Sequence, residues 1–333
     1  MQHATNATIA YWPTRRAPAS EDRYNSQISQ TVQLIRGRTR FYNKIFDRPS
    51  QTQKPVCGRR HPDGVGFYYN GQHTTDDAKF AEFPWTVAIM DDESVNDPED
   101  RKPAYYVSTG SLIHPSVVLT AAHFNIKKST FKVRAGITSV KANRFENELY
   151  PHQDRYVEEV KVHQQYDDHI LVYDIALLFL ASPMILAPNV GVVCLPTQNN
   201  RLPANIRCIG SGWGREKFGT NVAYRTQLKK FDLTLIDRYT CEELLQETRL
   251  GPFFKLHESF TCARDDSKKD KCQGDGGSPL GENIRYQQQG VASWGIGCGN
   301  EGIPLVYVDL SKARAWIDSA VVAKGFDPRV YTP

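Results

Sequence analysis

The apolar residues of this chain occur in short runs, and this pattern constrains the fold more than any other feature. From residue 84 onward each run covers only a few residues before a turn interrupts it. Short runs at this spacing are typical of the strands of an all-β sandwich or barrel. The runs that support this prediction are Trp85–Met90, Ser111–Ile113, Val117–Thr120, Phe131–Arg134, Val157–Val162 and Ile175–Leu180.

Two segments have helical patterns instead. The first lies around Asp237–Glu247. The second follows Ser311, which is its expected N-cap, and Gly325 is a suitable residue to end it. The chain has no internal repeat and no run of 18 apolar residues, so we expect no membrane span.

Residues 1–56 differ from the rest of the chain in composition. They hold nine Lys or Arg, three Asp or Glu, and no cysteine, so their net charge is about +6. The rest of the chain is slightly acidic, which brings the total net charge down to +4. We expect a disordered basic segment, and the alternative is an electrostatic docking arm or a protease-sensitive tether. Its first residues lack the apolar core of a signal peptide, so none is visible. The small total charge gives no reason to expect a nucleic-acid partner.

Three separated motifs carry the chemistry. They are Leu119-Thr-Ala-Ala-His123, Tyr173-Asp174-Ile-Ala-Leu-Leu178 and Cys272-Gln-Gly-Asp-Gly-Gly-Ser-Pro-Leu280. In this order they resemble the His, Asp and Ser motifs of the chymotrypsin/trypsin family (S1). Supporting matches are Glu82-Phe-Pro-Trp85, Cys208-Ile-Gly-Ser-Gly-Trp213-Gly214, Ser293-Trp294-Gly295 and Trp316-Ile317. The resemblance covers about residues 57–325, and within the family the chain is most similar to insect-type serine protease homologues.

The resemblance implies an all-β fold of two six-stranded antiparallel β-barrels with a C-terminal helix. It implies three parts: the basic segment 1–56, a disulfide-tethered linker 57–77 and a trypsin-like domain 78–333. The triad-equivalent positions are His123, Asp174 and Gly276, so the nucleophilic serine is replaced by glycine.

Ser278 is too far along the chain to replace it, because two residues of extended backbone move a side chain by roughly 6–7 Å. The backbone N–H groups of Gly274 and Gly276 match the oxyanion hole, which alone supports only weak catalysis. We therefore predict a pseudo-protease and not an enzyme, in which His123 and Asp174 remain as a hydrogen-bonded pair.

Two further positions depart from a working protease of this family. At the activation site Tyr68 stands where a basic residue is usually cut, and cleavage at Arg59-Arg60 would free a poor substitute terminus. The specificity-pocket positions are Asp270, Ser293, Gly295 and Leu305, and Leu305 replaces a glycine that usually lines the pocket. We expect Leu305 to fill space that a substrate side chain would need.

The seven cysteines indicate disulfides and one residue left over. By the resemblance the pairs are Cys57–Cys194, Cys241–Cys262 and Cys272–Cys298. Cys208 is then a free thiol, because Glu282 stands at its usual partner's place; an intermolecular bridge is the alternative. The bridge usually found beside the catalytic histidine is absent, since Ser108 and Phe124 occupy its two positions.

The resemblance implies a secreted protein that acts as a binding partner, cofactor or regulator in an extracellular protease cascade of immune or reproductive type. Its expected partners are extracellular proteins, such as active serine proteases or their zymogen substrates. The alternatives are an active endopeptidase using Ser278 or a water activated by His123, and a structural or adhesive extracellular protein. We expect no cofactor and no metal, since the calcium-loop position after Ala135-Gly136 holds Ile137 and no zinc spacing is present.

Overall fold

The computed structural model describes residues 56–66, 74–92, 104–126, 130–140, 150–214, 226–265, 277, 279–282, 286–296 and 302–333. The chain divides into two units, residues 1–54 and residues 55–333, and every described residue belongs to the second. The predictions for the basic segment 1–56 therefore fall outside the described residues, apart from its last position.

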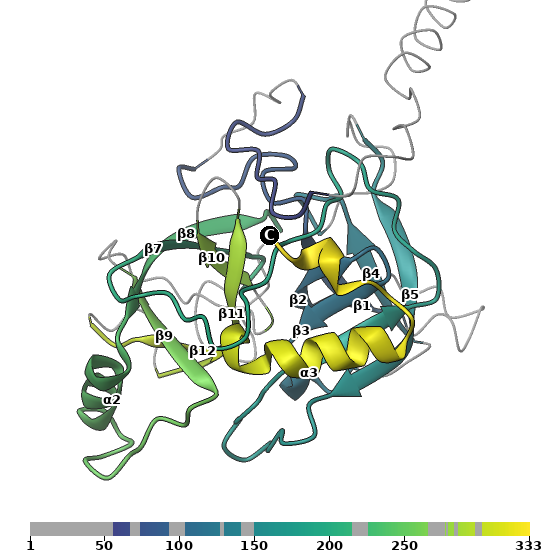
Figure 1. Ribbon diagram of the computed structural model, residues 1–333. Helices are drawn as coiled ribbons and strands as arrows, with labels where there is room; N and C mark the ends of the chain where they lie inside the picture. The colour runs from purple at the N-terminus through teal and green to yellow at the C-terminus, as the bar shows by residue number, and fades with distance from the viewer. Residues whose placement is uncertain are drawn as a thin grey trace, which may run out of the picture. The chain divides into compact units, whose positions relative to one another are not determined.

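The described strands form two closed barrels of six strands each, and all neighbouring strands are antiparallel (Figure 1). The first barrel has the order β1-β2-β3-β6-β5-β4, and the second has the order β10-β11-β12-β9-β8-β7. The strands are β1 Thr86–Asp91, β2 Tyr105–His114, β3 Val117–Thr120, β4 Phe131–Ala135, β5 Gln153–Val162, β6 Ala176–Leu180, β7 Arg207–Gly212, β8 Lys229–Ile236, β9 Phe260–Asp265, β10 Pro279–Glu282, β11 Gln287–Gly295 and β12 Leu305–Asp309. The predicted fold class is confirmed.

Four helices are described, and they are η2 Ala122–Phe124, α2 Arg238–Gln246, α3 Leu310–Ala323 and η3 Pro328–Tyr331. Asp237 caps α2 by accepting the Thr240 N–H at 2.9 Å. The predicted N-cap of the last helix is wrong, because Asp309 takes this role and accepts hydrogen bonds from both the N–H and the hydroxyl of Ser311. A carboxylate can accept more hydrogen bonds than a hydroxyl, so Asp309 and not Ser311 caps the helix. None of the described helices is long and apolar enough to cross a membrane.

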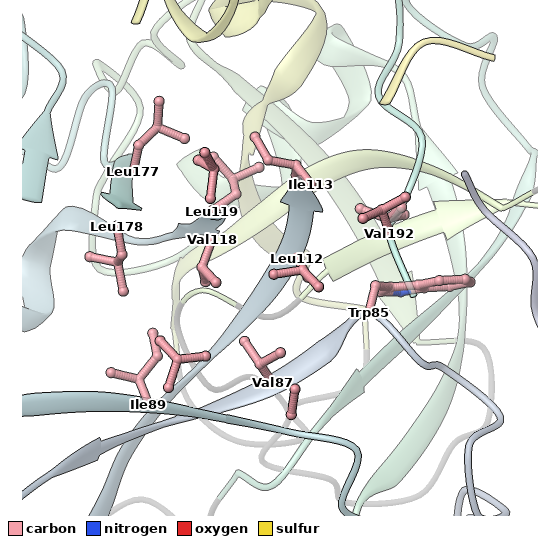
Figure 2. Packing of buried hydrophobic residues seen from close by; sticks show 14 of the residues in the cluster. Trp85, Val87, Ile89, Leu112, Ile113, Val118, Leu119, Leu177, Leu178 and Val192 are labelled. Carbon is pink, nitrogen blue, oxygen red and sulfur yellow. The ribbon is translucent and has the colours of Figure 1, made fainter. Parts of the chain in front are cut away.

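The core of the first barrel is closely packed with apolar side chains (Figure 2). Trp85 and Leu112 are fully buried there, and the same cluster continues to Tyr286 and to the inner face of α3. Two smaller clusters fill the second barrel, one inside it and one between α2, β9 and β12. The α3 face therefore joins the first barrel's core although the helix follows the last strand of the second.

A fully buried carboxylate joins the segment 57–66 to both barrels. Glu82 lies just before β1, and its side chain has no exposed surface. The Arg60 guanidinium contacts it at 2.5 Å, and the Lys230 ammonium of β8 donates to both of its oxygens at 3.1 Å. The backbone N–H of Lys79 supplies a further hydrogen bond at 2.9 Å. The Arg60 side chain is thus committed to an ion pair, which leaves the exposed Arg59 as the accessible member of the dibasic pair.

Two disulfides are present among the described residues, and they join the pairs that the resemblance implied. Cys57–Cys194 ties the start of the described chain to the segment between the barrels, and Cys241–Cys262 ties α2 to β9. The third expected pair, Cys272–Cys298, lies outside the described residues. Cys208 of β7 is buried beside the phenol groups of Tyr286 and Tyr307 and belongs to neither bridge.

We predict that Glu82→Gln lowers the free energy of unfolding by about 3 kcal/mol, toward the lower end of the range for breaking a buried ion pair because Arg60 and Lys230 are partly exposed. Chemical denaturation of the full chain measures this. The matched control is Asp63→Asn, which breaks the exposed ion pair with Lys79 in the same part of the fold and should leave the transition unchanged. Equal effects of the two substitutions would show that the buried ion pairs of Glu82 with Arg60 and Lys230 contribute no more stability than an exposed pair.

We also predict a pH-dependent stability that depends on His163. This imidazole is buried between Tyr173 and Trp316, and burial lowers its pKa from the usual 6.5. The unfolded chain binds the proton more readily, so the free energy of unfolding falls as the pH drops below about 6.5 and recovers as the pH rises.

His163→Phe keeps a ring against Tyr173 but cannot bind the proton. We expect the loss of stability between about pH 7.5 and about pH 5.5 to be smaller in this variant. The control is His169→Phe in the same part of the chain, because that side chain is 90% exposed and should not alter the slope. An unchanged slope in His163→Phe would contradict the prediction.

Candidate functional site

Three segments far apart in the sequence supply the candidate site. His123 lies in η2, directly after β3, and Asp174 lies two residues before β6. Ser293 comes from β11 of the second barrel. The strands β3 and β6 are neighbours with Thr120 opposite Ala176, so the histidine and the aspartate emerge at the same end of the first barrel. The structure therefore brings together the first two residues that the motifs singled out.

The three side chains are hydrogen-bonded in sequence. His123 Nδ1 lies 2.7 Å from Asp174 Oδ2, and the His123 N–H donates to the other carboxylate oxygen at 2.9 Å. The Ser293 hydroxyl donates to Asp174 Oδ2 at 2.6 Å. Since a carboxylate only accepts, His123 Nδ1 is the donor in this hydrogen bond, and Nε2 is the ring nitrogen that the pair leaves unused. The Asp174 side chain is fully buried and the His123 side chain is 26% exposed, so within this pair the imidazole is the member that reaches solvent.

The backbone before Asp174 is held in an unusual conformation. Tyr173 has φ +48°, in the left-handed region that side chains other than glycine seldom adopt. Its ring stacks on His163 at 4.4 Å, and its N–H donates to the Ser259 hydroxyl at 3.3 Å. These contacts, from the residue that follows β5 and the residue before β9, offset the strain and aim the carboxylate at His123.

The position of the missing bridge is filled by an aromatic ring. Phe124 lies against the His123 ring with 4.1 Å between their centroids and packs on the first barrel's core. Ser108, at the other half of the former bridge, is fully buried, and its hydroxyl has no hydrogen-bond partner among the described residues. The Phe124 ring therefore adds apolar packing beside His123, while the Ser108 hydroxyl is not satisfied by any described residue.

Gly277 is a structural requirement that the motif analysis did not single out. Its φ is +86°, and a Cβ there would lie 2.2 Å from the Thr109 carbonyl oxygen and 2.4 Å from Thr120 Oγ1. Its N–H donates to the Ala292 carbonyl at 2.9 Å. The chain directly after position 276 thus runs pressed between the first barrel and β11. The doubled glycine in the motif was the available signal.

Leu305 occupies the wall where a specificity pocket was expected. It faces Gly295 across the β11–β12 pair, and a Cβ on Gly295 would lie 3.1 Å from Leu305 Cδ2. The leucine also packs against the apolar cluster inside the second barrel. The Leu305 side chain therefore packs on the second barrel's core and also covers the Cα of Gly295.

Several predicted site positions lie outside the described residues. They are the oxyanion-hole positions Gly274 and Gly276, the pocket position Asp270, the alternative nucleophile Ser278 and the activation position Tyr68. Their roles remain predictions.

No group of three or more His, Cys, Asp or Glu side chains is arranged to hold a metal in the part of the chain that the structure describes. Of the acidic residues near the calcium-loop position, Asp154 is described and forms a bidentate pair with Arg134 at 2.8 Å. Its hydrogen bonds and the charges of Arg134 and Lys132 outweigh burial and lower its pKa. Its carboxylate therefore neutralises cations of β4.

Comparisons with known proteins agree with this geometry. The family model described as Trypsin matches residues 72–317. The chain is 49% identical to phenoloxidase-activating factor 2 of Galleria mellonella over 85% of this chain and 94% of that protein. It is 37% identical to the inactive CLIP domain-containing serine protease A8 of Anopheles gambiae over 80% of this chain and 71% of that protein. It is 30% identical to chymotrypsin-C of Mus musculus over 74% of this chain and 87% of that protein.

The matched region contains both barrels, the His123–Asp174 pair and the Ser293 contact. A family model that covers most of the chain and a relative at 49% identity leave one assignment. The chain belongs to the trypsin family of serine proteases.

Proposed function

We propose that this protein is a non-catalytic member of the family that acts by binding protein partners in an extracellular protease cascade. The observation that carries the proposal is the sequence Gly274-Asp-Gly-Gly-Ser-Pro279, in which glycine occupies the nucleophile position. Acyl transfer needs a hydroxyl or thiol that the base can deprotonate, and glycine has neither. Loss of the nucleophile costs on the order of 10⁶ in turnover in a serine protease.

The state of the remaining triad residues fits a structural role. Asp174 is fully buried, and both of its oxygens are occupied by His123 and Ser293. Each partner satisfies part of the hydrogen bonding that this buried carboxylate needs, so stability alone is a reason to retain the pair. The His123 backbone N–H and the Ser293 hydroxyl would still bond Asp174 without the imidazole. The Nε2 atom of His123 would be a base without a substrate nucleophile.

The specificity region also argues against turnover. Leu305 packs into the second barrel's cluster and against Gly295, where a glycine would leave room for a substrate side chain. We propose that Asp270, even if it lies at the pocket floor, is shielded by this leucine. Basic side chains of a substrate would then have no access to it.

The names of relatives suggest the pathway. Three relatives are named inactive CLIP domain-containing serine proteases, and another is named a phenoloxidase-activating factor. We propose a role in a cascade of this kind, with active proteases or their zymogens as partners. The two disulfides fit an oxidising, extracellular setting. In this proposal residues 57–77 form the linker and 78–333 the binding domain, and Cys208 keeps its thiol.

The intact His123–Asp174 geometry also supports a second candidate, an active protease that uses Ser278 or an activated water. The two candidates differ in their dependence on His123. A base is essential for hydrolysis but not for docking, so substitution of this residue separates them.

We predict that His123→Ala leaves the protein's effect in a cascade assay unchanged. The full chain is added to insect haemolymph, and phenoloxidase activity is followed after an elicitor; we expect wild type and variant to change it equally. The wild-type protein should also take no label from a fluorophosphonate, with a functional trypsin as the positive control. Loss of the effect in His123→Ala together with labelling of the wild type would show an enzyme. No effect of either protein in haemolymph would contradict the cascade role.

We predict that Gly276→Ser does not restore cleavage of arginine or lysine esters. Tyr68 still removes the activation cut, and Leu305 still fills the pocket wall. Ester hydrolysis should stay on the order of 10⁶-fold below that of trypsin, near the residual level that an oxyanion hole and substrate binding provide without a working triad. The triple substitution Gly276→Ser, Tyr68→Arg and Leu305→Gly, after treatment with trypsin, tests whether Tyr68 and Leu305 are what blocks activity. Efficient hydrolysis by Gly276→Ser alone would show that the other two positions do not block activity.

A further inference from the structure

Among the described residues, two histidines of the first barrel lie against the C-terminal part of the chain. His114 ends β2, and its ring stacks on that of Phe326 with 4.6 Å between the centroids. His163 follows β5, and its ring centroid lies 4.9 Å from that of Trp316 in α3. We call residues 310–333, which include α3 and η3, the C-terminal element. The two imidazoles thus contact this element at separate points along its length.

Both imidazoles accept a backbone hydrogen bond that requires the neutral ring. The Nδ1 atom of His114 accepts the N–H of Ser116 at 3.1 Å, and the Nδ1 atom of His163 accepts the N–H of Gln165 at 3.2 Å. Since an N–H group only donates, each Nδ1 must present its lone pair and carry no proton. Protonation of either ring would set two donors against each other and break this bond. The local fold around both residues therefore fits the uncharged imidazole.

Both rings are also shielded from water. His163 is 5% exposed, and the Tyr173 ring covers it with 4.4 Å between the centroids and 5° between the planes. Burial lowers the pKa of both imidazoles from the usual 6.5, although the negative charge of Asp327 opposes part of the shift at His114. An imidazole that local opening exposes to water binds a proton more readily than one in the closed protein. Acid therefore favours the open state over the closed one.

The charged groups that face His114 have ionic partners of their own. Asp327 is the acidic group whose charge acts on this ring, and its carboxylate pairs with Arg329 of η3 at 2.7 Å. Lys324, at the end of α3, pairs with Glu159 of β5. A proton on His114 would therefore have to compete with Arg329 for the nearby carboxylate.

Burial alone lowers the pKa of His163, with no contribution from a neighbouring charge. The ionisable groups on the elements packed against it also have partners. They are Asp167 and Asp168 in the loop after β5, Asp174 before β6, Lys312 and Asp318 in α3, and His257 against Tyr173. Within the described part of the chain none of these carboxylates pairs with the His163 ring, so a proton there would gain no ion pair.

The rest of the C-terminal element is anchored by groups that do not titrate near neutral pH. The Arg314 guanidinium donates to the Pro196 carbonyl and to Asp318, both at 2.8 Å. The phenol of Tyr331 is fully buried and also donates to Asp318 at 2.8 Å. Arginine and tyrosine keep their protons from about pH 7.5 to about pH 5.5, so in this range acid weakens the histidine contacts and leaves these donors unchanged.

We propose that His114 and His163 form an acid-sensitive clasp, in which their protonation loosens the C-terminal element from the first barrel. The open state binds up to two more protons than the closed state, so its population rises as the pH falls below about 6.5 and declines as the pH rises. Between about pH 7.5 and about pH 5.5 one histidine can favour opening by up to about tenfold, and both together by up to about a hundredfold. The clasp does not depend on the proposed function, because neither histidine belongs to the candidate site.

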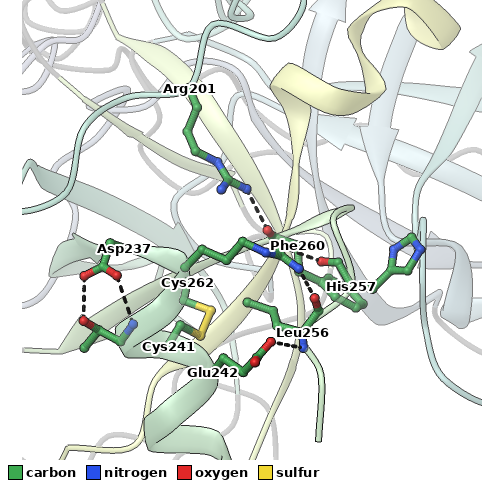
Figure 3. The surroundings of a disulfide bond; sticks show 10 residues. Arg201, Asp237, Cys241, Glu242, Leu256, His257, Phe260 and Cys262 are labelled. Atoms are coloured by element: carbon green, nitrogen blue, oxygen red, sulfur yellow. Dashed lines mark hydrogen bonds between the residues drawn. A yellow bond between two sulfur atoms is a disulfide. The ribbon is translucent and has the colours of Figure 1, made fainter.

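Hydrogen exchange of the full chain, followed by mass spectrometry at about pH 7.5 and about pH 5.5, tests the clasp. After correction for the intrinsic effect of pH on exchange, peptides from 310–333 should lose protection at least about fivefold at the lower pH. Peptides from α2 are the internal control, because this helix is fastened in the second barrel by the Cys241–Cys262 bridge and by Glu242, which accepts the Leu256 N–H at 2.9 Å (Figure 3). Their protection should change less than about twofold, since the opening is local. An equal loss in α2 would show general unfolding and overturn the inference.

Substitution of the two histidines tests their part in the opening. His114→Phe and His163→Phe each keep a ring but cannot bind a proton, so each should reduce the loss of protection between the two pH values, and the double variant should abolish it. His114→Asn and His163→Asn provide a second pair, because asparagine can accept the N–H two residues further on and does not titrate. The control is His169→Phe, whose native side chain is 90% exposed and should not affect the loss. A double variant of either kind that folds and keeps the wild-type pH dependence would overturn the proposal.

Discussion

The arrangement of this protein depends on a buried carboxylate at the junction of its two barrels. Asp174 comes from the first barrel and accepts hydrogen bonds from His123 of the same barrel and from Ser293 of the second. An ionised carboxylate without exposed surface is costly unless its oxygens are satisfied, so these three bonds must form together. This requirement keeps the histidine and the serine in place whether or not a nucleophile is present. A triad pair in a member of this family is therefore weak evidence of catalysis by itself.

Packing gives a role to two residues at which this chain departs from the usual pattern of the family. Phe124 lies against His123 and packs on the first barrel's core, and Leu305 adds apolar contact inside the second barrel. Each substitution contributes to the core at a position where an active protease keeps a bridge or an open pocket. Among the residues that the structure describes, the buried Ser108 hydroxyl has no hydrogen-bond partner, which costs free energy.

The sequence could predict those parts of the fold that depend on local patterns and on motif order. Runs of apolar residues located the strands of the first barrel, Asp237–Glu247 located α2, and the resemblance implied the two disulfides that the described residues contain. The N-cap of α3 was wrong because two adjacent acceptors competed, and the carboxylate of Asp309 is the stronger.

Long-range contacts were beyond reach of the sequence. Nothing in the Arg59-Arg60 pair indicates that Arg60 is bound to a carboxylate 22 residues further along the chain. The close approach of Gly277 to Thr109 and Thr120 likewise depends on tertiary packing, although the doubled glycine hinted at it. Residues 270, 274 and 276 lie outside the described chain, so the predicted oxyanion hole and pocket floor stay predictions.

Rigid anchoring connects the scaffold to recognition. The loop 247–258, which follows α2, is fastened by the Cys241–Cys262 disulfide and by side chains of α2. The loop 164–173, between β5 and β6, is fastened through Tyr173 to His163 and Ser259. The same Tyr173 contacts that aim Asp174 at His123 therefore also fasten the end of the loop 164–173. In an active protease such coupling would orient a substrate relative to the nucleophile. The contacts of Tyr173 with His163 and Ser259 do not involve the nucleophile position, so they fix this geometry whichever residue stands there.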